Sequence, residues 1–302
     1  MTPARAAGTV ALTLVVMVAV PAPAWAHAGG LSPTGVRGVV LDVTPAVPGL
    51  TVTAIEDGAR LLVRNETGTA VDVPPGDGQA VPVPVPPGAT VTWIDARATT
   101  LDRDLGAAAT RPWTVPVTVG TVPVTVTGEF VAEPAPTAWF WWGTAALIGV
   151  GVTLLTRRAR RPHVLLTVAG VTAVLASVAH VVGATLAVES APLWGTLLDA
   201  TGAGLLVWPL VAGAAVTAVR GSAGGVLGVC AGSGLSVVFV LPDLTVFHHG
   251  VLPFAGPPDL SRLLVAVVLG AGGAAAVAGA GALRALAERR TSTSAEPGSD
   301  FS

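Results

Sequence analysis

Lysine and tyrosine are absent from this chain of 302 residues, and cysteine occurs once, as Cys230. Without lysine the chain can form neither a Schiff base nor a serine–lysine dyad. A single cysteine excludes a disulfide within the chain. The two methionines, Met1 and Met17, both lie near the start, where we expect a leader, and this excludes a methionine-rich copper site.

Other signatures of enzymes are also missing. Gly232-Ser233-Gly234 lies in a long apolar stretch and lacks the strand–turn–helix setting of a nucleophile elbow. The chain has no phosphate-binding glycine loop, and the aspartates between residues 95 and 104 lack the spacing of a calcium loop. We therefore expect no enzymatic activity and no cofactor, with copper as the one alternative considered below.

Charged residues make up 11% of the chain and hydrophobic residues 52%, which indicates a membrane protein. The clearest membrane segment is 138–162, which is about long enough to cross a bilayer. It ends in four arginines between residues 157 and 161, a pattern typical of the cytoplasmic side. It begins with aromatic rings that favour the membrane interface: Trp139, Trp141 and Trp142. The segment predicts a helix that enters from outside and leaves inside.

Residues 1–26 have the pattern of a secretory signal peptide. Arg5 gives the positive start and residues 10–20 form the apolar core. Ala24-Trp25-Ala26 has the small-x-small pattern that precedes a cleavage site. A retained first membrane helix is the alternative, but the core is short and prolines follow it. Cleavage after Ala26 would make His27 the mature N-terminus.

Residues 27–133 are predicted to form an extracytoplasmic antiparallel β-sandwich of Ig-like type. Short runs of alternating apolar and polar residues are separated by turn signals such as Pro48-Gly49, a pattern typical of about seven strands. The expected strands are 39–43, 50–55, 60–63, 70–73, 90–94, 114–119 and 121–127.

The connections of this domain carry further predictions. Residues 56–58 and 65–68 are expected to be hairpin loops, and 95–111 a long polar loop. Residues 82–87 alternate with proline, which lacks the ladder donor, so they form an edge strand or a loop. Eleven acids against six arginines give residues 27–133 a net charge of −5, which argues against a nucleic-acid partner. Residues 134–137 are a stiff linker.

Residues 138–287 are predicted to form a membrane bundle of five helices. The four further spans are expected at 164–187, 193–218, 223–247 and 260–286, with a kink at Pro209 in the third. Residues 288–302 are predicted to be a disordered cytoplasmic tail.

The charges between these spans predict the orientation. Arginines fall on the inner side, and the acids Glu189, Asp243 and Asp259 fall outside, with Arg262 as the exception. We therefore expect a multi-pass plasma membrane protein in contact with the lipid bilayer, with its N-terminal domain extracytoplasmic and its C-terminus cytoplasmic.

Small residues recur every four positions in the last two spans, at 224, 228 and 232 and from 270 to 282. This spacing lets helix backbones approach closely within lipid. Packing inside the bundle is the simpler interpretation, and a homo-oligomer interface is the alternative.

His180 and Asp199 are the strongest candidates for chemistry inside the membrane. A charged residue in the bilayer costs about 3 kcal/mol on insertion scales, so it usually faces a partner or a wet cavity. Both residues lie near the outer ends of neighbouring spans, so a contact between them is expected. The pair would serve a proton relay or a metal, or, as the simpler alternative, would lock two helices by a structural hydrogen bond.

The other histidines suggest copper. His248 and His249 are adjacent in a predicted outer loop that also holds Asp243, and imidazole suits copper or zinc. His27, once exposed at the mature N-terminus, would offer its amine and its ring nitrogen to one metal ion. A pair of solvated loop histidines and a histidine merely tolerated after the cleavage site are the alternatives.

The overall plan resembles a group of uncharacterised actinobacterial-type membrane proteins, which have a signal peptide, a histidine–glycine start, a β domain and a helical bundle. The residues that carry this resemblance are 27–34, 49–52, 92–97 and 111–116. In that group the tryptophan segment often has histidines beside the aspartate, whereas this chain has Ile94 and Ala96 beside Asp95. The histidine start and the β domain are also similar to secreted copper-carrier domains.

Three functions follow from these observations. The first is a non-enzymatic membrane protein whose β domain binds an envelope protein partner or ligand. The second is extracytoplasmic copper handling through His27 and the outer-face histidines. The third is a small transporter that uses His180 and Asp199.

Overall fold

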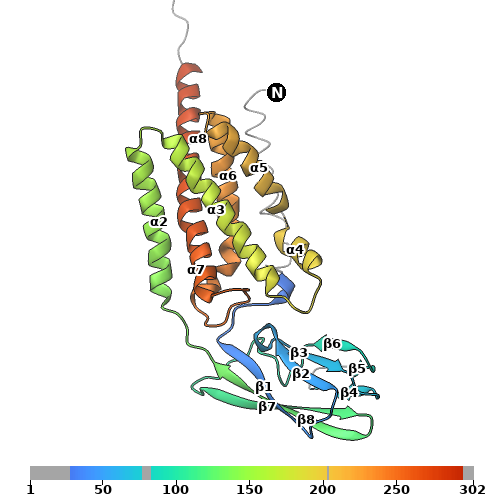
Figure 1. Ribbon diagram of the computed structural model, residues 1–302. Helices are drawn as coiled ribbons and strands as arrows, with labels where there is room; N and C mark the ends of the chain where they lie inside the picture. Colours follow the sequence, from blue (N-terminus) through green and yellow to red (C-terminus); the bar gives the residue numbers. More distant parts are fainter. Residues whose placement is uncertain (1–27, 77–82, 203, 295–302) are drawn as a thin grey trace, which may run out of the picture.

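A computed structural model describes residues 28–76, 83–202 and 204–294. The expected leader, His27 and the end of the tail lie outside these residues. The strands gather at one end of the helices, so the chain forms a β domain followed by a helical bundle (Figure 1).

The β domain consists of two antiparallel sheets. The larger has the order β1-β8-β7-β4-β5 and the smaller the order β2-β3-β6. The strands are β1 (Val36–Thr44), β2 (Leu50–Ile55), β3 (Arg60–Asn65), β4 (Val71–Val73), β5 (Val83–Val85), β6 (Thr90–Trp93), β7 (Thr110–Val119) and β8 (Val122–Ala132). The predicted antiparallel β part is confirmed, and the proline-rich segment supplies β5, which lies at an edge of its sheet.

The two sheets share one hydrophobic core. Alternate residues of each strand point inward, as in β7, where Val115 and Val117 are buried between exposed neighbours. The smaller sheet contributes Leu61 and Val63 to the same cluster. Trp113 lies over Gly128 of the neighbouring strand, where a Cβ atom would lie 2.1 Å from the indole ring, so only glycine leaves room for it.

One predicted connection of this domain was wrong. Residues 65–68 do not close a hairpin, because β3 and β4 belong to different sheets. The buried side chain of Asn65 fixes this crossing, since its amide nitrogen donates to the carbonyl oxygens of Thr69 and Val85 at 2.9 and 2.8 Å. The predicted loop 95–111 is confirmed over residues 95–109, although Ala98 and Leu105 within it join the core and β7 already begins at Thr110.

The helical part contains α2 (Ala138–Arg158), α3 (Pro162–Leu186), α4 (Leu193–Thr201), α5 (Gly204–Ala218), α6 (Ala223–Val240), the 3-10 helix η3 (Leu241–Phe247), α7 (Pro258–Val267), the π-helical turn η4 (Val268–Gly272) and α8 (Gly273–Ser294). Among the described residues, four stretches are long and apolar enough to cross a membrane: Ala138–Arg158, Pro162–Leu186, Ala223–Phe247 and Pro258–Leu283. A fifth results if α4 and α5 count as one bent span. The helical part thus has the spans of an integral membrane protein.

Several predicted details of the spans were wrong. The third span breaks by 68° between α4 and α5, rather than at Pro209, which lies inside α5. Gly202 ends α4 with φ +42° and ψ −121°, a conformation that favours glycine. The predicted fourth span, 223–247, is confirmed, and because η3 completes it, the expected place of Asp243 in an outer loop was wrong. Helix α8 runs to Ser294, past the expected end at residue 287.

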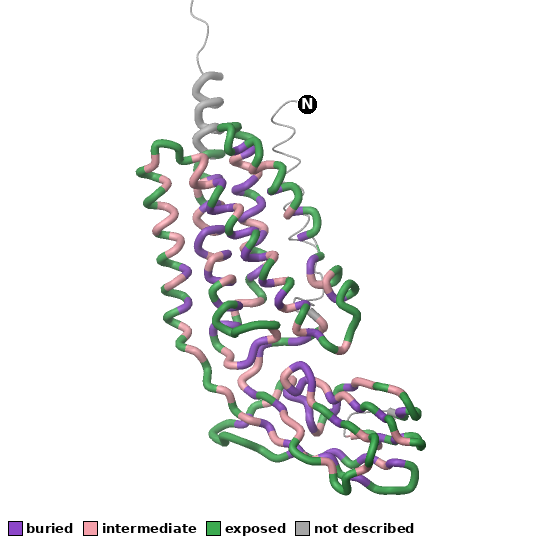
Figure 2. The backbone as a smooth tube through the Cα atoms, in the orientation of Figure 1, coloured by how far each residue is buried: buried purple, intermediate pink, exposed green. Residues whose placement is uncertain are grey.

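The small residues of the bundle contact helices of the same chain. A Cβ atom added at Gly232 would lie 2.0 Å from Val211 of α5, and one at Gly270 would lie 2.5 Å from the carbonyl oxygen of Ala145 in α2. The outer faces of the helices are exposed, most of all on α2 (Figure 2). Internal packing therefore uses these glycines.

Candidate functional site

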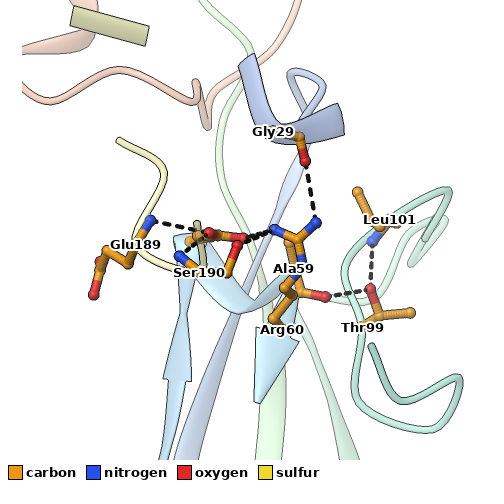
Figure 3. Close-up of polar contacts among 8 residues, drawn as sticks. Gly29, Ala59, Arg60, Thr99, Leu101, Glu189 and Ser190 are labelled. Carbon is orange, nitrogen blue, oxygen red and sulfur yellow. Dashed lines mark hydrogen bonds and ion pairs between the residues drawn. The ribbon is translucent and has the colours of Figure 1, made fainter. Parts of the chain in front are cut away.

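A buried carboxylate joins the β domain to the bundle. Glu56, in the turn between β2 and β3, has a side chain with 0% exposure. Its Oε1 accepts hydrogen bonds from the backbone N–H groups of Glu189 and Ser190, at 3.0 and 2.9 Å, in the connection between α3 and α4. Its Oε2 pairs with Arg60, which is 19% exposed. We call Glu56, Arg60 and their partners in 189–190 the latch (Figure 3).

Arg60 extends the latch to the start of the described chain. Its Nη1 donates to Ser190 Oγ at 2.7 Å, and its Nη2 donates to the carbonyl oxygen of Gly29 at 3.1 Å. Three segments far apart in the sequence therefore meet at one guanidinium group (Figure 3). Removing both groups of an ion pair from water is costly, and this cost is offset only when further hydrogen bonds satisfy both groups, as they do here.

The local fold explains why Glu56 points at the bundle. Glu56 and Asp57 both have positive φ, 54° and 56°, a left-handed conformation that is uncommon for residues other than glycine. Gly58 then packs on β1, where an added Cβ atom would lie 2.4 Å from the Cα atom of Gly38. The back of the turn is thus fixed to the sheet, and its side chains face the membrane part.

A second contact and a cavity lie beside the latch. Thr34 and Val251 exchange two backbone hydrogen bonds of 3.0 Å, which tie the segment before β1 to the segment after η3. Between the two parts lies a cavity of about 230 Å³, lined by both, including Asp57, Leu101 and Phe254. Burial raises the pKa of the Asp57 carboxyl, Arg37 at 3.4 Å opposes this, and Glu133 adds to it.

The buried histidine of α3 does not pair as the sequence suggested. His180 Nε2 lies 3.4 Å from Oδ2 of Asp243 in η3, and His180 Nδ1 lies 3.5 Å from Oγ of Ser261 in α7. Asp199 is exposed on α4 and, within the described residues, has neither a hydrogen bond nor an ion pair. The predicted contact between His180 and Asp199 was wrong, because Asp243 continues a span and turns inward.

The three residues His180, Asp243 and Ser261 form what we call the intramembrane cluster. All three lie in candidate membrane spans and line a cavity of about 30 Å³, which is large enough for one water molecule. Phe254 stacks on the His180 ring, with centroids 6.1 Å apart, and also lines the cavity beside the latch. One aromatic ring therefore contacts both the latch side and the cluster side.

Arg262, the exception to the charge pattern, has a structural task. It is buried in α7, its Nε donates to the carbonyl oxygen of Val246 at 3.1 Å, and its Nη2 donates to that of His249 at 2.8 Å. Its Nη1 pairs with Asp259 at 2.7 Å. Arg262 thus holds the end of η3 and the residues that follow it.

The adjacent histidines lack a third metal ligand. His248 is exposed, and burial, then His248, then Arg262 lower the pKa of His249, which favours its neutral form. Over the part of the chain that the structure describes, no three histidine, cysteine or acidic side chains are grouped to hold a metal ion. His27 lies outside that part, so copper binding there stays a prediction.

The tryptophans at the start of α2 lie in two different environments. Trp139 is 85% exposed and Trp142 is partly exposed, as residues at a membrane interface would be. Trp141 is 8% exposed and stacks on Phe247 with ring centroids 6.3 Å apart. The helix begins with four consecutive aromatic residues, Trp139 to Trp142, and consecutive residues on a helix point about 100° apart, so they cannot all face the lipid. Trp141 faces the bundle, and its assignment to the interface belt was wrong.

The tryptophan segment 92–97, one of the four that carry the family resemblance, has an internal structural role. The buried Asp95 carboxylate accepts from Arg97 Nε and Nη2 at 2.8 and 2.7 Å, and from Trp93 Nε1 at 3.3 Å. Burial acts to raise the pKa of Asp95, but the hydrogen bonds from Arg97 and Trp93 outweigh it and lower this pKa. The aspartate therefore holds its own loop together.

Comparison with known protein families, with curated proteins and with solved structures found no match. The resemblance to actinobacterial-type membrane proteins stays a prediction.

Sequence reasoning missed the roles of five residues of these sites: Glu56, Arg60, Asp243, Ser261 and Arg262. Arg60 follows Glu56 at a spacing that suits an ion pair, but the same spacing is common on exposed surfaces. Ser261 carried no signal beyond its place in an apolar span, and Arg262 was noted only as the exception to the charge pattern. Asp243 was placed in an outer loop, whereas it lies in η3, whose first turn contains Pro242.

Proposed function

We propose that this protein is a non-enzymatic membrane protein that presents its β domain on the outer side of the plasma membrane, where the domain binds an envelope protein or ligand. The latch carries this proposal. A domain on a flexible linker would need no buried carboxylate bonded to the bundle, whereas Glu56, held by Arg60, accepts hydrogen bonds from the backbone of residues 189 and 190 and so fixes one orientation. A partner bound to the β domain is thereby held at a defined height above the bilayer.

The distribution of charge supports the outer placement. The connections at the end of the bundle away from the β domain carry Arg158, Arg160, Arg161 and Arg220 (Figure 1). Arginine in short loops is retained on the cytoplasmic side. The end near the β domain carries acids instead, and its one arginine, Arg262, is buried and paired within the protein.

The partner-binding surface is expected at the end of the β domain farthest from the bundle. The register pairs Val36 with Ala132 next to the membrane part, so the opposite ends of β1 and β8 lie far from it. Leu41, 63% exposed at the β1 bulge, and Val122, at the start of β8, are exposed hydrophobic residues there.

In-cell photocrosslinking tests this proposal. A photoreactive amino acid at position 41 or 122 should give the same discrete adduct in repeated experiments, and one at position 160, in an inner connection, should not. The Glu56→Ala variant should reduce the adduct without reducing the amount of protein. Adducts that vary between experiments, or that match those at position 160, would refute partner binding by this surface.

A second function is favoured by the intramembrane cluster. Ionisable residues inside a membrane span commonly mark ion or proton pathways, and histidine exchanges protons near neutral pH. A small proton-coupled transporter would therefore use His180 with Asp243, in place of Asp199. Asp243→Asn should abolish a proton-coupled flux in proteoliposomes while the protein still assembles, and Asp199→Asn should not. If Asp243→Asn only lowers the melting temperature, the cluster is structural.

A further inference from the structure

A groove between α2 and the last span faces the bilayer. Its volume is about 640 Å³, and its wall is formed by apolar or small residues of α2 and α8, such as Val150, Leu154, Gly273 and Val277. Trp142 lines it on the side of the β domain, and Arg157 lines it at the opposite end. The groove therefore runs along the bundle from an aromatic ring to a guanidinium group.

Backbone contact creates this groove. Gly149 and Gly270 meet where an added Cβ at Gly149 would lie 3.3 Å from the carbonyl oxygen of Gly270, so α2 lies close to η4 there. Beyond that contact Gly273 has open space, since a Cβ atom there would meet nothing within 4 Å. Helix α2 is also the least buried candidate span, with 11% of its window buried against 39% or more for the other three.

We propose that this groove binds one anionic phospholipid of the inner leaflet, with an acyl chain along the apolar wall and the phosphate on Arg157. Arg157 and Arg158 are exposed at the helix end, and Arg160 and Arg161 follow directly. Basic sites between membrane helices on the cytoplasmic side are suited to acidic headgroups. The proposal uses the orientation argued above but is independent of any partner of the β domain.

Charge also favours a lipid over a second copy of this chain. Up to residue 290, the inner end of the bundle carries eight arginines and one acid, Glu288. A parallel copy would therefore place mostly positive charge against Arg157. The other acids of the membrane part, Glu189, Asp199, Asp243 and Asp259, belong to the other end.

Native mass spectrometry of the full-length protein tests this inference. Delipidated protein in detergent is mixed with phosphatidylglycerol or with phosphatidylcholine of the same acyl chains. The native chain should retain one phosphatidylglycerol in preference to phosphatidylcholine. Arg157→Gln should reduce that preference about fivefold, the effect expected of one basic side chain at an anionic surface. Gly273→Leu should reduce retention of both lipids, because leucine fills the groove.

Two matched variants control for general effects. Arg158→Gln removes a neighbouring charge that does not line the groove, and Gly151→Leu adds a side chain at an equally open glycine of α2 outside it. Both should retain the native preference. Equal binding of the two lipids, or equal losses in Arg157→Gln and Arg158→Gln, would overturn the proposal. So would a dimer that Gly273→Leu dissociates, since the groove would then hold a second copy.

Discussion

Removing the Glu56 carboxylate should release the β domain from the bundle. In Glu56→Ala the backbone N–H groups of Glu189 and Ser190 lose their acceptor, and the guanidinium of Arg60 loses its counter-ion while keeping its hydrogen bonds to Ser190 and Gly29. Removing one partner of a buried ion pair costs about 3–5 kcal/mol, because the other charge remains buried without compensation. The lower value already changes the equilibrium between the attached and released states roughly 100-fold, at about 1.4 kcal/mol per tenfold.

Amide hydrogen exchange measures this release directly. The full-length protein in lipid nanodiscs is exchanged and digested, and the peptide that spans residues 187–192 is followed. Its protected amides include the two N–H groups that Glu56 accepts from, and release exposes them to water. We expect their exchange to become at least about 100-fold faster in Glu56→Ala, in proportion to the population of the released state.

A matched exposed pair provides the control. Arg64 and Glu66 form a salt bridge on the same domain with side chains 62% and 57% exposed. Exposed pairs contribute between zero and about 1 kcal/mol, so Glu66→Ala should leave the 187–192 peptide unchanged. Unchanged exchange of that peptide in Glu56→Ala would refute the latch. Loss of protection in β7 as well would show that the domain had unfolded rather than separated.

Three further predictions concern other parts of the chain. The pKa of Asp95 is lowered in the folded state, so its ion pair stabilises the β domain above the unfolded-state pKa of about 4. This stabilisation is lost as the pH falls through the folded-state pKa. Asp95→Asn should therefore lower the melting temperature at pH 7 much more than at pH 3, and equal losses would contradict this. Gly58→Ala should destabilise the β domain by about 1–3 kcal/mol more than Gly106→Ala, because both glycines have positive φ but only Gly58 has a backbone atom 2.4 Å from the added methyl group. Denaturant unfolding followed by tryptophan fluorescence should show this difference in stability, and equal effects of the two substitutions would contradict it. Arg262→Met leaves two backbone carbonyls without their donor and should speed amide hydrogen exchange around residues 246–249. Asp259→Asn changes a carboxylate that is 78% exposed and should not speed this exchange. Similar exchange in the two variants would contradict the assigned role of Arg262.

Much of the fold could be predicted from the sequence because strong local patterns fix it. Alternation with period two places the strands, and proline marks β5 as an edge strand. Apolar length places the spans, since a bilayer crossing needs about 20 residues. These rules act within a short stretch of chain, so they need no knowledge of the rest of the molecule.

The sites could not be predicted in the same way, because they depend on contacts between distant segments. Glu56 and Ser190 are 134 positions apart, and nothing in the sequence of a β-turn shows that its carboxylate will be buried by a loop of the bundle. His180 was recognised as a buried ionisable residue, but its partner depended on whether Asp243 lies in a loop or on a helix. Asp243 lies in η3, and this places its carboxylate beside His180.

The central claim is that the β domain lies on the outer surface of the bundle, opposite the arginine-rich connections. Single-cysteine labelling of intact cells with a membrane-impermeant maleimide tests it, and the native Cys230 is buried in α6 and serves as the unlabelled background. We predict that Leu41→Cys is labelled in intact cells and that Arg160→Cys is labelled only after the membrane is permeabilised. Labelling of Arg160→Cys in intact cells, with Leu41→Cys protected, would contradict the account.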